Sequence, residues 1–303
     1  MRRAVREILG FLGEILRRCA LHSIDTQSAA LAFYSLFALA PLLLVIVSIA
    51  GRTLAEGQAR GEIVRQLQGF MGSEAGHAVA TLLEKAAKAG ADRGAVGIVG
   101  IVVLALATTA VFLQLQEALN KVWEVAARPG QMFHALLKRR VASFALVLAA
   151  GALLLVSLTL SAALLAITDR LAERMPLPVG LITLGNEVLS FLVLTVLLAV
   201  IYRVLPDAKL EWQDVGIGAV VTSSLFSTGK WLIGVVLARS AATSQLGIAG
   251  STVVILLWVY YESYILLFGA ELTAVYSSRY RHQPVTPEAG ATRAGVLPGR
   301  AVP

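Results

Sequence analysis

The sequence is poor in charged residues and holds almost no cysteine. Only 15% of its 303 residues are Asp, Glu, Lys or Arg, whereas soluble domains usually carry about 25%. The single cysteine, Cys19, excludes an intramolecular disulfide framework. No two of the four histidines stand close enough for a local metal-binding motif, and no glycine-rich phosphate-binding loop is present. We therefore expect neither a metal nor a cofactor.

Apolar residues dominate what remains. They make up 57% of the chain, and the mean hydropathy is +0.76, which favours an integral membrane protein over a soluble one. The formal charge of +7 could indicate a nucleic-acid partner. Lys and Arg are concentrated beside apolar segments, however, where they act as topology signals and contact anionic lipid headgroups. We therefore expect membrane lipids as partners and no nucleic acid.

Six apolar stretches are each long enough to cross a bilayer, which needs about 20 residues per helix. They predict an all-α polytopic membrane helix bundle. Lys and Arg are more frequent in the segments on the side of the two termini, so we expect both termini in the cytoplasm. The predicted spans are residues 28–50, 94–116, 141–168, 180–202, 215–238 and 249–276.

The segments outside these spans divide the chain further. Residues 1–27 are predicted to form a cytoplasmic amphipathic helix on the inner membrane surface, because Ile8, Leu12, Ile15 and Leu16 recur at helical spacing. Residues 28–276 form the six-helix transmembrane domain, with an external helical segment at 51–93. Residues 277–303 contain prolines and few large apolar side chains, which predicts a disordered cytoplasmic tail.

Several strings occur in a fixed order along these segments. They are Ala29-Ala-Leu-Ala-Phe-Tyr-Ser-Leu-Phe-Ala-Leu-Ala-Pro41-Leu42, Ala118-Leu-Asn-Lys-Val-Trp123, Tyr202-Arg-Val-Leu-Pro-Asp207, Gly247-Ile-Ala-Gly-Ser251, Leu256-Leu-Trp-Val-Tyr-Tyr261 and Leu267-Phe-Gly-Ala-Glu-Leu-Thr273. Over about residues 15–280 the chain resembles the YihY/virulence factor BrkB family of bacterial inner-membrane proteins. The family usually has a small residue after the Tyr-Tyr pair, whereas this chain has Glu262. The resemblance implies an inner-membrane location and a link to envelope lipids or lipopolysaccharide. Members of the family that the chain resembles also carry an older label, ribonuclease BN.

Ionisable residues inside the predicted spans are the strongest functional pointers, because a charge at the centre of a membrane helix costs about 2.5–3.5 kcal/mol. Lys230 lies in the fifth predicted span, Glu262 in the sixth and Glu187 in the fourth. We predict that they form a central polar cluster. The alternatives are charges that merely neutralise each other, a substrate, lipid-headgroup or proton site, and side chains that reach an interface. Polar neighbours of this cluster are Asn186, Ser223 and Ser227.

Two further groups of polar residues lie at the predicted cytoplasmic side. Gln114, Glu117, Asn120 and Glu271 form a predicted polar cluster at the helix ends, which can equally be a solvated helix end. The basic run from Lys138 through Arg139 to Arg140 begins the third span. It is either a contact for anionic lipid or a plain topology signal.

The sequence favours a protein that transports or organises an envelope lipid or small substrate, with an anionic lipid or lipopolysaccharide precursor as a candidate. The alternative is a structural or scaffolding protein for envelope integrity. We do not expect a nuclease or another enzyme, and we assign no catalytic residues. Phosphodiester hydrolysis commonly needs clustered acids that hold divalent metals, or a histidine acid–base pair. The acids on the predicted cytoplasmic side are scattered.

Overall fold

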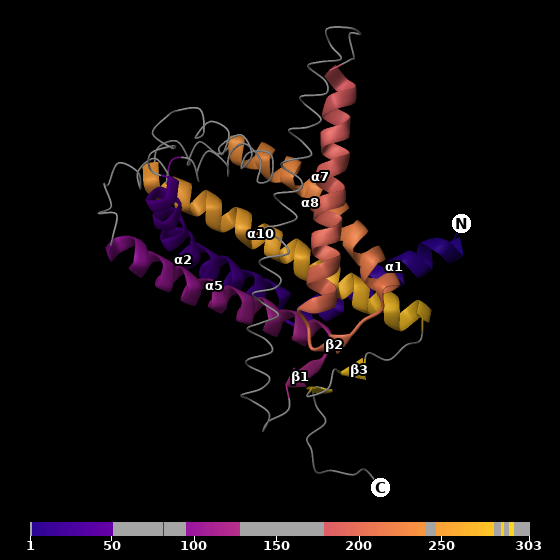
Figure 1. The fold of residues 1–303 in the computed structure, drawn as a ribbon. Helices are drawn as coiled ribbons and strands as arrows, with labels where there is room; N and C mark the ends of the chain where they lie inside the picture. The colour runs from indigo at the N-terminus through magenta and orange to yellow at the C-terminus, as the bar shows by residue number, and fades with distance from the viewer. Residues whose placement is uncertain are drawn as a thin grey trace. The chain divides into compact units, whose positions relative to one another are not determined.

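The described part of the protein is mostly helical and contains two short strand pairs (Figure 1). This computed structural model describes residues 2–50, 81, 95–127, 179–239, 247–281, 286–287 and 291–293. The prediction of an all-α fold is confirmed. The long helices are α1 (Arg2–Leu21), α2 (Ile24–Ala50), α5 (Ala95–Val122), α7 (Val179–Val204), α8 (Trp212–Arg239) and α10 (Gly247–Tyr276), which the π-helical turn η1 (Ser277–Arg281) continues.

Five of the six predicted spans correspond to described helices, namely α2, α5, α7, α8 and α10. The third predicted span, 141–168, and the external segment 51–93, apart from Thr81, lie outside the described residues. By length and apolar composition, three stretches in the described part of the chain can cross a membrane. They are Val102–Val122, Glu187–Val204 and Thr252–Arg279.

Two left-handed residues end helices in this fold. Ser23, with a φ of 52°, separates α1 from α2, and Glu124, also with a φ of 52°, follows α5. At the second end, the backbone N–H groups of Trp123 and Glu124 donate to the carbonyls of Leu119 and Lys121 at 3.0 and 3.1 Å. Carbonyls in the last turn of a helix have no partner within it, so these bonds close α5 and turn the chain away from its axis.

The chain divides into two compact units. The first unit comprises Met1–Arg18, Leu119–Ser224 and Phe268–Pro303, and the second comprises Cys19–Ala118 and Leu225–Leu267. Ile15, Leu119 and Tyr202 are fully buried in the first unit, whereas Ile24 and Leu31 are buried in the second. Each unit therefore has an apolar core of its own.

Both strand pairs belong to the first unit. Strand β1 (Val125–Ala127) pairs antiparallel with β4 (Ala291–Arg293), and β2 (Ala208–Lys209) pairs antiparallel with β3 (Thr286–Pro287) (Figure 1). The sequence predicts a disordered tail from residue 277 onward, but the structure places η1 and two strands within it. The local composition gives no sign of these strands, because their partners follow α5 and α7 far earlier in the chain.

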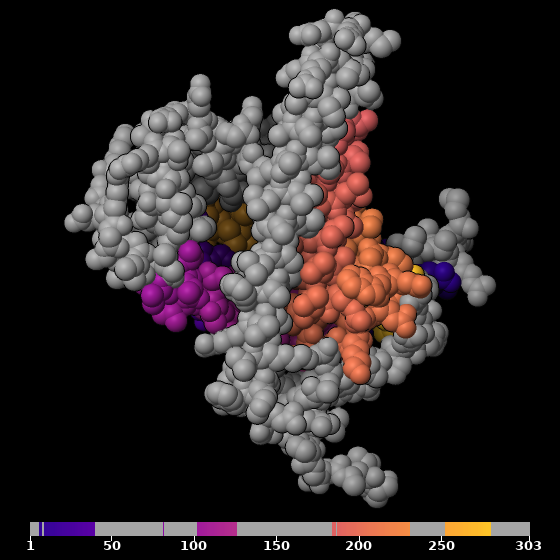
Figure 2. All heavy atoms as spheres, in the orientation of Figure 1, coloured from indigo at the N-terminus to yellow at the C-terminus, as the bar shows by residue number. Residues whose placement is uncertain are grey.

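Several large apolar side chains are exposed on α1 and α7. In α1, Ile15 is fully buried, but Leu12 and Leu16, from the same predicted apolar face, are exposed. The exposed face of α7 carries four aliphatic residues at a spacing of four, which places them along one stripe. They are Leu184, Val188, Leu192 and Val196. Figure 2 shows atoms of α7 at the visible surface.

Candidate functional site

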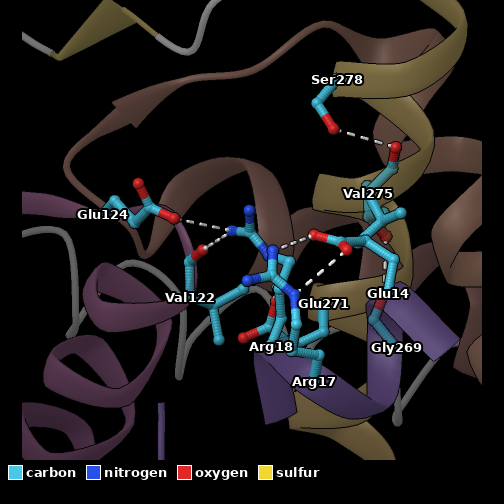
Figure 3. Close-up of polar contacts among 10 residues, drawn as sticks. Glu14, Arg17, Arg18, Val122, Glu124, Gly269, Glu271, Val275 and Ser278 are labelled. Carbon is cyan, nitrogen blue, oxygen red and sulfur yellow. Dashed lines mark hydrogen bonds and ion pairs between the residues drawn. The ribbon is translucent and has the colours of Figure 1, made fainter. Parts of the chain in front are cut away.

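A buried ion pair joins α1 to α10 in the first unit. The guanidinium Nε of Arg18 donates to Oε2 of Glu271 at 3.0 Å (Figure 3). The Glu271 side chain is completely buried, whereas that of Arg18 retains 19% of its exposure. A buried carboxylate is tolerated only when it is paired and hydrogen-bonded, so Arg18 provides the positive charge that Glu271 needs.

The same guanidinium also binds the end of α5. Its Nη2 donates to the backbone carbonyl of Val122, the last residue of α5, at 3.0 Å, and lies 3.2 Å from a carboxylate oxygen of Glu124 (Figure 3). The end of a helix carries unpaired carbonyls and a partial negative charge, which a cation stabilises. One arginine therefore holds α1, α5 and α10 together.

The neighbouring arginine makes only a surface contact. Arg17 donates from Nη2 and Nε to the carboxylate of Glu14 at 2.6 and 3.2 Å, one turn earlier on α1. The Arg17 side chain is 64% exposed. The hydrogen bond from Arg17 lowers the pKa of Glu14 below its ordinary value, and its charge adds to this effect. Arg17 is thus a natural control for Arg18.

A second polar contact fixes the loop between α7 and α8. The side-chain amide of Asn120 donates to Oδ2 of Asp207 at 2.9 Å, and the backbone N–H of Asp207 donates to Oδ1 of Asn120 at 2.8 Å. Asn120 uses both ends of its amide, which pins the loop in one orientation. Two strings quoted for the family resemblance, at 118–123 and 202–207, meet at this pair.

Helices α8 and α10 pack through two Gly-x-x-x-Thr motifs in the first unit. Gly218 lies against the side chain of Thr273, and Gly269 lies against that of Thr222. Each threonine hydroxyl donates to the carbonyl of the glycine in its own motif, at 2.7 Å in both cases. Small residues let two helix backbones approach closely. The reciprocal contacts therefore define how the two helices meet in this unit.

Tyr202 completes this packing from α7. Its hydroxyl lies 3.1 Å from Oγ1 of Thr222 and is fully buried. The single proton of Thr222 is already donated to Gly218, so the Tyr202 hydroxyl is the donor in this bond. The polar groups of this network are matched to one another, which is typical of a structural core rather than of a ligand site.

The second unit contains a carboxylate of a different kind. Glu262 lies inside the span Thr252–Arg279 of α10 and is only 8% exposed. Both of its carboxylate oxygens are buried and have no hydrogen-bond partner in the described part of the protein. Lys230 of α8 interacts electrostatically with it. This pair corresponds to the centre of the predicted polar cluster.

A close helix contact places Lys230 and Glu262 at the same level. Gly229, which precedes Lys230, is buried against the ring and hydroxyl of Tyr261, which precedes Glu262. Because adjacent residues on a helix differ by only about 1.5 Å in height, this contact aligns the two charged residues along the helix axes. The indole Nε1 of Trp258, one turn before Glu262, is also buried without a hydrogen-bond partner among the described residues.

The other predicted members of the central cluster lie elsewhere. Glu187 is exposed on α7 of the first unit, where Ser223 is buried and its hydroxyl has no hydrogen-bond partner among the described residues. Ser227 shares the second unit with Lys230 and Glu262, but it is exposed. Asn186 belongs to α7, and its side chain lies outside what the structure describes.

The predicted cytoplasmic-end cluster is divided between separate contacts. Gln114 donates to the side-chain carbonyl of the buried Gln27 at 2.8 Å in the second unit. Glu117 of that unit is exposed. Asn120 and Glu271 belong to the first unit, where they bind Asp207 and Arg18 as described. The predicted lipid contact formed by Lys138, Arg139 and Arg140 lies outside the described residues.

Sequence reasoning missed Arg18 and Asp207 as partners of these residues. Arg18 stands in a basic stretch that resembles a topology signal, and its partner Glu271 is 253 positions away. For Asp207, the string that contains it was the only signal available. No group of three His, Cys, Asp or Glu side chains that could hold a metal occurs within the described ranges.

These observations define an integral membrane protein built from long apolar helices that carry buried polar contacts. Residues 15–293 match the family model described as Virulence factor BrkB. The chain belongs to this family, as its resemblance predicts. No solved structure matches the chain at a significant level.

Three relatives are each described as a UPF0761 membrane protein. A UPF0761 membrane protein of Pseudoalteromonas atlantica is 24% identical over 267 residues, which cover 88% of this chain and 85% of the relative. One of Actinobacillus pleuropneumoniae is 23% identical over 271 residues, which cover 87% and 92%. One of Ralstonia nicotianae is 24% identical over 261 residues, and the match covers 57% of that longer relative.

Proposed function

We propose that the protein is a multi-pass protein of the bacterial cytoplasmic membrane that transports or organises an envelope lipid or small substrate. Both termini face the cytoplasm in this proposal, and the protein performs no enzymatic reaction. The observation that carries the proposal is Glu262, a carboxylate that is 8% exposed within a membrane-spanning helix and has no hydrogen-bond donor among the described residues. A purely structural carboxylate should be satisfied, as Glu271 is.

The contrast between the two buried carboxylates supports a functional role for only one of them. Glu271 accepts a charge-assisted hydrogen bond from Arg18 at 3.0 Å. Glu262 has an electrostatic interaction with Lys230, but no residue in the described part of the chain donates a hydrogen bond to either of its oxygens. Leaving a buried carboxyl group without its hydrogen bonds costs about 1–3 kcal/mol, and more when it is ionised, unless another molecule provides them. A polar headgroup or small substrate that enters the membrane-spanning part would do so.

Translocation of fluorescent phospholipids tests this function. Purified protein is reconstituted into phosphatidylcholine vesicles that contain a trace of phospholipid labelled on an acyl chain, with one of several headgroups. A membrane-impermeant reductant then bleaches the outer leaflet. The wild type should expose additional labelled lipid over time, and Glu262→Gln should slow this exposure. The matched control is Glu211→Gln, at an exposed residue that precedes α8.

The outcomes separate transport from its alternative. A wild-type rate equal to that of protein-free vesicles for every labelled headgroup contradicts transport of membrane lipids. Equal rates for the wild type and Glu262→Gln contradict the role of this carboxylate.

The scaffolding alternative is favoured by the hydrogen bonds of Arg18, which connect three helices. It predicts that variants in that network lower stability and that none alters a flux.

A further inference from the structure

Two polar groups on one face of α10 in the second unit have no hydrogen-bond partner among the described residues. The indole N–H of Trp258 is a donor, the carboxylate of Glu262 is an acceptor, and neither has a hydrogen-bond partner among the described residues. Residues four apart on a helix are neighbours on its surface. The same short stretch of helix therefore offers a donor and an acceptor that no described side chain uses.

The charges beside this stretch restrict what can bind there. Glu262 would repel an anion, and Lys230, which acts electrostatically on Glu262, would repel a cation. A molecule that carries both charges avoids both penalties. Its cationic part must also donate hydrogen bonds, since the two Glu262 oxygens accept none from the residues that the structure describes. Its anionic part must accept one, because an indole nitrogen is only a donor.

We propose that Glu262 and Trp258 form a binding site for a zwitterionic group composed of a primary ammonium and a phosphate. The ammonium donates to the carboxylate of Glu262, and a phosphate oxygen accepts from the Nε1–H of Trp258. The positive charge of Lys230 favours the phosphate. The proposal rests on the transport function above and narrows its substrate class to ethanolamine-phosphate headgroups or to free molecules of the same chemistry.

The contact between Gly229 and Tyr261 positions this site. Gly229 is buried against the Tyr261 ring and hydroxyl, so α8 lies close to α10 directly beside Lys230 and Glu262. A larger residue at position 229 would separate the two helices at this level. The site therefore lies beside a close approach of the two helices in the second unit.

Phosphatidylethanolamine and phosphatidylcholine are a matched pair of ligands, because their headgroup cations differ in the number of N–H groups. A primary ammonium has three N–H donors, whereas the quaternary ammonium of choline has none. We would measure the thermal stability of the purified protein in detergent against increasing concentrations of short-chain phosphatidylethanolamine and of phosphatidylcholine with the same acyl chains. Phosphatidylglycerol, which lacks an ammonium, is the third ligand. Glycerophosphoethanolamine, which lacks acyl chains, is the fourth.

The wild type should bind the ethanolamine lipid at least about tenfold more tightly than the choline lipid, because hydrogen bonds to a charged group are lost with choline. Glu262→Gln should remove about tenfold or more of that affinity. Trp258→Phe should remove about fivefold, since it loses a single hydrogen bond. The control Glu211→Gln should bind as the wild type does. If Glu262→Gln fails to fold, Trp258→Phe decides the outcome, because it keeps the charge.

Equal affinity for the ethanolamine and choline lipids, or unchanged affinity in both variants, overturns the proposal. Tight binding of glycerophosphoethanolamine identifies a free zwitterion as the ligand, whereas binding of the lipid alone identifies a headgroup, and either result supports the site. The translocation assay is independent of this one. Binding without translocation overturns only the transport function, and translocation without a headgroup preference overturns only this site.

Discussion

Replacing Arg18 with alanine leaves the Glu271 carboxylate buried without its cation. Glu271 is 0% exposed, and the Arg18 guanidinium lies 3.0 Å away. Removing one partner of a buried pair costs roughly 3–5 kcal/mol, and losing the bond to the Val122 carbonyl adds about 1 kcal/mol. Arg18 is 19% exposed, which lets water offset part of this cost. We expect a loss of about 3–4 kcal/mol in the free energy of unfolding.

The pair should respond asymmetrically to mutation. Glu271→Gln still accepts a hydrogen bond from Arg18, whose charge remains partly hydrated and close to Glu124. This variant should therefore lose less stability than Arg18→Ala. The double variant Arg18→Ala/Glu271→Gln should lose less than the sum of the two single variants, because its buried amide carries no charge.

Reversible unfolding by sodium dodecyl sulfate in mixed micelles, followed by tryptophan fluorescence, would measure these differences. The control is Arg17→Ala, which removes an adjacent arginine that is 64% exposed and should change stability little. If Arg18→Ala is no more destabilising than Arg17→Ala, or if the double variant is additive, Arg18 does not neutralise Glu271 and the explanation of this network is wrong.

Three further predictions use the same unfolding measurement. Gly218→Ala should lower the free energy of unfolding by about 1–3 kcal/mol, because the added methyl group meets a buried threonine of α10. Gly216 has open space around it, so Gly216→Ala should instead stabilise α8 by about 0.5–1 kcal/mol. Asn120→Ala should cost about 1–3 kcal/mol, since it leaves a loop carboxylate and a backbone N–H without their partner. Ser23→Gly should stabilise the protein by about 1 kcal/mol, because the residue has a φ of 52°, and Ser23→Val should do the reverse. Equal effects at positions 216 and 218, no loss at 120, or a stable Ser23→Val variant would contradict the respective explanations.

The long helices could be predicted from the sequence because a membrane helix satisfies its own backbone and needs only a continuous apolar stretch. Their ends were less accurate. The second span was predicted to end at residue 116, whereas α5 continues to Val122. Polar residues such as Asn120 are poor markers of membrane depth, but they remain compatible with a helix. Hydropathy therefore locates the membrane-spanning part and not the whole helix.

The polar contacts could be predicted only in part. Glu262 and Lys230 stood out because charges are rare in apolar stretches, and Lys230 acts electrostatically on Glu262. The packing glycine of α8 could not be identified from the sequence. Gly218 makes the close contact in the first unit, whereas Gly216 has open space around it. A rotation of about 160° separates residues two apart on a helix, and small residues on both faces of α8 hide this difference.

The bond between Arg18 and Glu271 also has a consequence for how the protein is made. The two residues are 253 positions apart in the chain. At about 5–20 residues per second, a ribosome needs on the order of tens of seconds to add Glu271 after Arg18. During that interval the guanidinium must stay hydrated or bound to lipid phosphate. An added protease should therefore cleave α1 in nascent chains, and a crosslinker on α1 should capture neighbouring molecules. Both signals should disappear once α10 has been synthesised. The late-synthesised helix α10 therefore secures the early-synthesised helix α1.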